Sequence, residues 1–181
     1  MKKILYSVAL AACCMGTMTS CSDFLDASNK SNETAKQSFA TKEGLNNLVN
    51  DAYQHLQNVY AAPLFTSCFS AGTDMYADAR NKMNEALNTY ETLTPENTDI
   101  KNLYTYLYSG IRAANSVSYY AQTAQVDDKT KSQLIGEARV LAAYEYYLLV
   151  NNFGGVPIMK DFLTTADTGY PKSSLEDVYA Y

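Results

Sequence analysis

The 181-residue sequence contains no tryptophan and a single histidine, His55. It has four cysteines, and three of them, Cys13, Cys14 and Cys21, crowd one segment near the start. There is neither a CxxC pair nor a cluster of histidine and cysteine, so the sequence supports neither a zinc site nor a disulfide framework. Cys68, which lies in the body of the chain, is expected to be a small buried apolar residue.

Catalytic motifs are equally scarce. The sequence has no Gly-x-Ser-x-Gly, no His-Glu-x-x-His and no glycine pattern of the kind that binds phosphates or dinucleotides. Asp127 and Asp128 lie in a predicted turn, whereas a glycosidase needs two carboxyl groups on either side of a cleft. Because no second histidine or cysteine lies near it, His55 is expected to be a solvated helix residue. We therefore expect neither an enzyme nor a metal or cofactor.

Positive charge is also sparse. The formal net charge is −5. A protein surface with net negative charge repels the phosphate backbone of nucleic acid, so nucleic acid is not an expected partner. Hydrophobic residues make up 47% of the chain, and tyrosine alone supplies 16 residues. This composition suits one globular domain with a sizeable core.

Residues 1–20 have the layout of a secretory signal peptide. Two lysines precede an apolar stretch that is too short for a permanent transmembrane helix. The stretch ends in Met-Thr-Ser-Cys21, which resembles a bacterial lipoprotein signal, in which the chain is cleaved before the cysteine and the cysteine is acylated. A rival cleavage site before Cys13 stays open, as does an ordinary signal peptide. We favour Cys21, where two or more acyl chains would give a stable membrane anchor.

Downstream of this signal, the residues 21–37 are predicted to be the lipidated N-terminus and a polar tether, and 38–181 a helical domain. Apolar residues recur there at intervals of three and four, which is typical of amphipathic helices. The predicted helices cover 41–60, 97–124 and 128–152, and a capping box from Ser173 to Glu176 opens a fourth. No strand pattern is found. The sequence therefore predicts an all-α fold of tetratricopeptide-like antiparallel helix pairs.

Several residues have expected roles within these helices. Thr41 and either Asn97 or Thr98 are the expected N-caps of the first two. Gly110 and Gly136 lie inside helices, where glycine costs about 1 kcal/mol relative to alanine, so each is expected to let a neighbouring helix come close.

Residues 61–96 interrupt the helical pattern. Their apolar residues show no sustained regular spacing, and they contain two prolines and a glycine. They are therefore predicted to form a long excursion with one short helix near 78–88. Loops of this length in compact domains tend to carry function.

Four segments resemble one known family, the SusD/RagB outer-membrane nutrient-binding lipoproteins. GEARVLAAYEYYLLVNNFGGVPIM, residues 136–159, resembles the family signature, and CSDFLD, LYTYLYSGIRAANSV and PKSSLEDVYAY resemble further segments in the family order. Ala142 and Lys172 stand where the family commonly has arginine, and Val140 where it has phenylalanine. Family members usually have several hundred residues, so we expect this chain to be a fragment or a truncated reading frame.

The resemblance implies a lipid-anchored protein of the outer membrane, exposed at the cell surface, that captures an oligosaccharide or another nutrient. It also implies delivery of that ligand to a SusC-like TonB-dependent transporter. Cys21 is followed by two acidic residues, Asp23 and Asp26. Acidic residues at this place resemble the surface-export signal of Bacteroidetes lipoproteins. Two alternatives stay open: a helical-repeat interaction scaffold without a small ligand, and a non-functional truncated fragment.

The excursion supplies the candidate ligand-binding residues. Sugars stack on aromatic rings and donate and accept hydrogen bonds through their hydroxyls, and the side chains suited to this are Asp74, Tyr76, Arg80, Asn81 and Tyr90. The residues of the signature are instead expected to be structural. Glu137 and Arg139 are expected to pair or cap within the helical layer, and the tyrosines at 144, 146 and 147 to pack between helices.

Overall fold

The computed structural model describes residues 35–61, 63–76, 85–165 and 169–181. These residues belong to one compact unit, Thr34–Tyr181. The described part is helical and contains no strand, so the predicted all-α class is confirmed. None of its helices is both long enough and apolar enough to cross a membrane. The predicted signal peptide and Cys21 lie outside the described residues.

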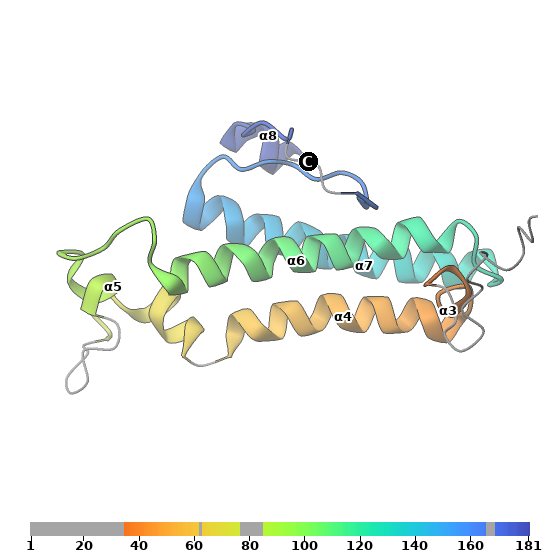
Figure 1. Cartoon of the computed structure of the whole chain (residues 1–181), viewed down its shortest axis with the longest axis horizontal. Coiled ribbons are helices and arrows are strands. Elements are labelled where there is room, and N and C mark those ends of the chain that lie inside the picture. Colours follow the sequence, from red (N-terminus) through yellow and green to blue (C-terminus); the bar gives the residue numbers. More distant parts are fainter. Residues whose placement is uncertain (1–34, 62, 77–84, 166–168) are drawn as a thin grey trace, which may run out of the picture. The chain divides into compact units, whose positions relative to one another are not determined.

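Three long helices make up most of this unit: α4 (Lys42–Tyr60), α6 (Thr98–Ala121) and α7 (Asp128–Phe153). Helix α6 packs against both α4 and α7, and α4 also contacts α7. Consecutive long helices run in opposite directions, so α4 and α7 run in the same direction (Figure 1). This is the arrangement of antiparallel pairs that the sequence predicts.

Polar side chains begin each long helix by accepting hydrogen bonds from backbone N–H groups that have no partner within the helix. Thr41 Oγ1 accepts from Gly44 N at 3.0 Å, which confirms the predicted cap of α4. Asn97, rather than Thr98, caps α6, since its Oδ1 accepts from Asp99 N at 3.0 Å. Asp127 Oδ1 caps α7 by accepting from Thr130 N at 3.0 Å.

Four short elements complete the described structure: α3 (Ala35–Ser38), the π-helical turn η1 (Thr66–Ser70), α5 (Glu85–Thr89) and α8 (Leu175–Ala180). Residues 35–37 of the predicted tether are thus helical, because Phe39 packs on Tyr120 of α6, with ring centroids 4.9 Å apart, and holds the end of α3 in place. Helix α5 overlaps the end of the short helix predicted at 78–88, whose residues 78–84 lie outside the described part.

The cap of α8 differs from the prediction by one residue. Ser174, not Ser173, begins the helix, and its Oγ accepts from Asp177 N at 3.0 Å. Ser173 is held elsewhere, since its N–H donates to the carbonyl oxygen of Val156 at 3.2 Å. The pattern Ser-x-x-acid that opens a helix is present at 174–177 instead of at 173–176.

The buried side chains form two apolar clusters along the helices. One joins the first half of α4 to the second half of α6 and the first half of α7, and it contains Leu45, Leu48, Val49, Ala52, Ala113, Ala114, Val117, Ala121, Ala124, Leu134, Ala138 and Leu141. The other joins the remaining halves to the chain beyond α7, and it contains Val59, Leu103, Leu107, Ile111, Tyr146, Leu148, Leu149, Val150, Val156 and Val178. These residues include much of the predicted apolar stripes, whose burial is the main stabilising term.

Helix α7 ends at a double glycine. Gly154 has a φ of +70°, which disfavours residues with a side chain, and its N–H donates to Val150 O at 3.0 Å. A Cβ on Gly155 would overlap the carbonyl oxygen of Ser173, so the close approach of the two segments requires glycine. The chain then runs back over α6 and α7 (Figure 1).

Three side chains hold this return segment, residues 156–165. Tyr108 donates to Pro157 O at 2.7 Å, Asn115 Nδ2 donates to Met159 O at 2.8 Å, and Met159 N donates to the hydroxyl of Tyr146 at 2.6 Å. The sequence GGVPIM, residues 154–159, therefore ends α7 and fixes the chain that follows to both α6 and α7. We call these residues the clasp.

The two glycines expected to admit a neighbouring helix, Gly110 and Gly136, differ. Gly110 of α6 lies in close contact with Glu145 of α7, as expected of a glycine that admits a neighbour. For Gly136 the expectation is wrong. Apart from its two chain neighbours and the nearby backbone of its own helix, no atom lies within 4 Å of the place that a Cβ would occupy. Gly136 is on the exposed side of α7.

Candidate functional site

The five predicted ligand-binding residues are only partly described. Arg80 and Asn81 lie outside the described residues, whereas Asp74 is exposed and Tyr76 is half-buried just after η1. Tyr90 is 59% exposed with a φ of +61°, and its ring lies against Gly72. None of the three lines the hollows described below. Their role in binding stays a prediction.

Five aromatic rings lie together where α4 ends, and we call Tyr60, Phe65, Phe69, Tyr144 and Tyr147 the aromatic surface. Phe65 lies between two neighbours, with ring centroids 5.5 Å from Tyr60 and 5.3 Å from Phe69. On α7, the rings of Tyr144 and Tyr147 stack with centroids 6.1 Å apart and planes inclined by 20°. A hydrogen bond between the hydroxyls of Tyr60 and Tyr144 joins the two groups.

Much of the aromatic surface faces solvent. Tyr60 is 42% exposed, Tyr144 39% and Tyr147 52%. The expectation of packing between helices therefore holds for Tyr146, which is 4% exposed. It holds in part for Tyr144, whose hydroxyl bonds to Tyr60 of α4 although its side chain faces solvent, and it is wrong for Tyr147. The spacing of three residues between Tyr144 and Tyr147 places them on one helix face, which was the available signal. The sequence does not show that this face of α7 is left uncovered.

A polar contact lies farther along the same pair of helices. The hydroxyl of Tyr53 on α4 donates to Glu137 Oε1 on α7 at 2.9 Å, so Glu137 binds within the helical layer as predicted. Arg139 is exposed and has no hydrogen bond or ion pair within the described residues, so its predicted pairing is not found.

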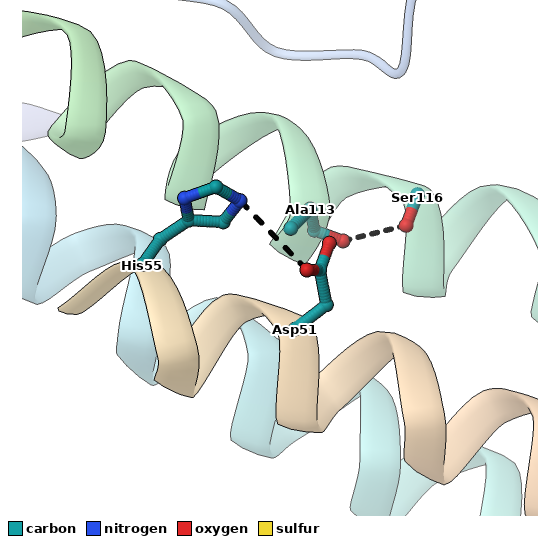
Figure 2. A network of polar contacts seen from close by, with 4 residues as sticks. All are labelled: Asp51, His55, Ala113 and Ser116. Atoms are coloured by element: carbon teal, nitrogen blue, oxygen red, sulfur yellow. Dashed lines mark hydrogen bonds and ion pairs between the residues drawn. The ribbon is translucent and has the colours of Figure 1, made fainter. Parts of the chain in front are cut away.

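The opposite side of α4 carries a hollow of about 400 Å³, which we call the α4–α6 hollow. It is lined by Phe39, Leu48, Asp51, His55, Ser109, Arg112, Ala113, Ser116, Tyr120 and Phe162. Figure 2 shows Asp51 and His55 extending from α4 toward α6, with His55 Nε2 3.8 Å from Asp51 Oδ1. The His55 side chain is only 26% exposed, so the expectation of a solvated residue is wrong. Its ring lies between two packed helices.

A second hollow of about 630 Å³ adjoins the first, between α6 and the return segment, and we call it the α6 hollow. It is lined by Tyr104, Thr105, Tyr108, Ser109, Arg112, Asn115, Met159, Asp161, Leu163, Thr164 and Thr165. Ser109 and Arg112 line both hollows, so the two spaces meet at these residues. A further hollow, also about 630 Å³, lies between α6, α7 and α8 and reaches Tyr147 of the aromatic surface.

Burial raises the pKa of two ionisable groups, Cys68 and Glu145. Burial, together with the Asp99 carboxylate, raises the pKa of the Cys68 thiol to about 11, so the nucleophilic thiolate is scarce at neutral pH. Burial raises the pKa of Glu145 to about 9, but this carboxyl lines none of the hollows above. The described residues include no group of three side chains placed to hold a metal ion.

Comparison with known proteins agrees with these features. A family model for SusD-like proteins, described as "Starch-binding associating with outer membrane", matches residues 23–181. No curated protein sequence matches the chain significantly. The crystal structure of a SusD-like carbohydrate binding protein from Bacteroides fragilis is similar in fold, with a TM-score of 0.54 and 19% sequence identity. The similarity covers 81% of this chain and 30% of that protein. Since the family match covers residues 23–181, nearly all of the 181-residue sequence, the chain belongs to the SusD-like family, as its motifs predict.

Proposed function

We propose that this chain is a non-catalytic protein that binds a carbohydrate on the aromatic surface. The observation that carries the proposal is the set of neighbouring, solvent-exposed rings formed by Tyr60, Phe65, Tyr144 and Tyr147. The C–H face of a sugar ring is apolar, and placing it on an aromatic ring removes apolar area of both partners from water.

The polar groups around the rings suit a neutral, hydroxyl-rich ligand. The hydroxyls of Tyr60 and Tyr144 can each donate and accept, so they match the hydroxyls of a sugar. The net charge of −5 does not favour an anionic ligand. The description of the family as starch-binding, and of its Bacteroides fragilis relative as carbohydrate binding, supports an oligosaccharide of the starch type as the first candidate.

The proposal extends to cellular location and partner. The protein is anchored in the outer membrane by acyl chains on Cys21, faces the cell surface, and passes its ligand to a SusC-like TonB-dependent transporter. The lipoprotein-like signal and the family's description as associating with the outer membrane support this. Co-purification of the transporter with the tagged, membrane-extracted protein would test the partnership.

Affinity electrophoresis in gels containing soluble starch tests the binding proposal. The wild-type chain is expected to be retarded, and Tyr144→Ala/Tyr147→Ala is expected to lose most of the retardation. Val140→Ala is the matched control, because Val140 is a 70% exposed residue of the same helix without a ring. Asp74→Ala and Tyr90→Ala test the excursion in the same gels. Wild-type protein that binds neither starch nor any glycan on an array would contradict the proposal and favour an interaction scaffold.

A further inference from the structure

Arg112 is an exposed residue of α6 and lies where the α4–α6 hollow meets the α6 hollow. Its guanidinium carbon lies 5.0 Å from the centroid of the Phe162 ring, so the planar group rests on an aromatic face. Within the described residues Arg112 makes no hydrogen bond and no ion pair. A guanidinium carries five N–H donors in a rigid fork, and here they border both hollows.

Each hollow also has a carboxylate acceptor. Asp51 lines the α4–α6 hollow, and His55 Nε2 lies 3.8 Å from its Oδ1, which is too far for a hydrogen bond. Figure 2 shows the Asp51 carboxylate directed from α4 toward α6. Asp161 lines the α6 hollow, and within the described part of the chain it accepts no hydrogen bond. The two joined hollows are therefore lined by one guanidinium donor and two carboxylate acceptors.

Aromatic rings line both spaces. In the α4–α6 hollow, Tyr120 lies between two neighbours, with ring centroids 4.9 Å from Phe39 and 5.8 Å from Phe162. In the α6 hollow, the rings of Tyr104 and Tyr108 have centroids 4.8 Å apart. Each hollow thus combines an aromatic wall, a carboxylate and access to the shared guanidinium.

This combination selects the charge of a ligand. A carboxylate or phosphate group bound to Arg112 would share the hollows with the Asp51 and Asp161 carboxylates, and like charges would oppose its binding. A molecule with several neutral hydroxyls donates to both carboxylates and accepts from the guanidinium. Hollows of about 400 and about 630 Å³ are within the usual range for small-ligand sites, about 300–1,000 Å³.

We propose that the two hollows meeting at Arg112 form a second carbohydrate site, separate from the aromatic surface, which holds a neutral oligosaccharide with a sugar unit on each side of the arginine. The ligand class rests on the proposed function, whereas the position rests on the geometry of Asp51, Arg112 and Asp161. Binding across both hollows requires at least two linked sugars, so a monosaccharide binds more weakly than a short oligosaccharide.

Isothermal titration calorimetry of the full chain tests this site, with maltotriose, glucose and trigalacturonate as probes. Arg112→Ala and Asp161→Asn are each expected to weaken the maltotriose affinity of this site about tenfold or more, the usual effect of losing a hydrogen bond to a charged group. Arg112→Lys keeps the charge but loses the fork and is expected to fall between Arg112→Ala and the wild type. Lys101→Ala is the control, since Lys101 is an exposed cation of the same helix that lines neither hollow.

Stoichiometry separates this site from the aromatic surface. Wild-type protein is expected to bind two molecules of maltotriose, and Arg112→Ala and Tyr144→Ala/Tyr147→Ala one each. If the tyrosine variant abolishes all binding while Arg112→Ala and Asp161→Asn change nothing, the second site is wrong and the proposed function stands. If the wild type binds none of the three probes, the second site is wrong, whereas the proposed function is decided by the starch gels and the glycan array. Tighter binding of trigalacturonate than of maltotriose, lost in Arg112→Ala, would overturn the assignment of a neutral ligand.

Discussion

The carboxyl group of Glu145 on α7 lies directly against Gly110 on α6. Glu145 is completely buried, and neither of its carboxyl oxygens has a hydrogen-bond partner within the described residues. Glycine provides the space, because a Cβ at position 110 would overlap the carboxyl group. Burial raises the pKa of Glu145 from 4.5 to about 9, so this side chain is protonated at neutral pH.

The first prediction is that stability falls as pH rises. The folded chain keeps the Glu145 proton up to about pH 9, whereas the unfolded chain releases it above 4.5. The stabilising contribution is therefore complete below 4.5 and is lost progressively as the pH approaches 9. A single group of this kind lowers the free energy of unfolding by at most about 1.4 kcal/mol per pH unit. Urea denaturation across this pH range measures the slope.

Glu145→Gln is the matched variant for this measurement, since glutamine has nearly the same shape and does not titrate. We expect the difference in unfolding free energy between variant and wild type to shift in favour of the variant as pH rises. Parallel pH profiles for the two proteins would show that Glu145 is not the titrating group.

The second prediction contrasts Gly110 of α6 with Gly136 of α7. Gly110→Ala is expected to destabilise the protein by about 1–3 kcal/mol, the usual effect of overpacking, because the new methyl group meets Glu145. Gly136→Ala is expected to stabilise it by up to about 1 kcal/mol, since the helix gains propensity and the position is open. Thermal melts measure both.

Coupling with Glu145 identifies the cause of the first effect. In Gly110→Ala/Glu145→Ala the added methyl group no longer meets a carboxyl, so the penalty of Gly110→Ala should be much smaller in this background. An equal penalty in both backgrounds would mean that another contact is responsible.

The third prediction concerns the clasp after α7. Tyr146→Phe removes the hydroxyl that accepts from Met159 N at 2.6 Å. A half-buried donor without a partner costs about 1–3 kcal/mol, so we expect a loss of stability in that range and faster amide exchange at Met159. Tyr147→Phe is the control, because Tyr147 is 52% exposed, and a change beyond about 0.5 kcal/mol there would argue against this explanation.

The fourth prediction tests the membrane anchor. Cys21→Ala is expected to abolish labelling by a fatty-acid probe and to release the protein from the membrane fraction, since the acyl chains hold it there. Cys13→Ala should leave both unchanged. The reverse result would move the cleavage site to Cys13.

Local chemistry was enough to predict the helices and much of their capping from the sequence. The caps at Thr41 and Asn97 depend on a side chain and the N–H groups two or three residues beyond it. The spacing of apolar residues by three and four predicted which face of α4 is buried. The glycines at 154 and 155 predicted the end of α7. The sequence motifs also identified the family, because the four segments that resemble it are short local patterns and occur in the family order.

Long-range packing decided the rest. Tyr144, Tyr146 and Tyr147 are the same residue type on one helix, and only the position of α4, α6 and the return segment determines that Tyr146 is buried and the other two are exposed. The space that Gly110 leaves for Glu145 likewise depends on how α6 and α7 align. The hollows around Arg112 combine residues from α4, α6 and the return segment. Such placements depend on contacts between distant parts of the chain, so local patterns cannot reveal them and only the tertiary structure does.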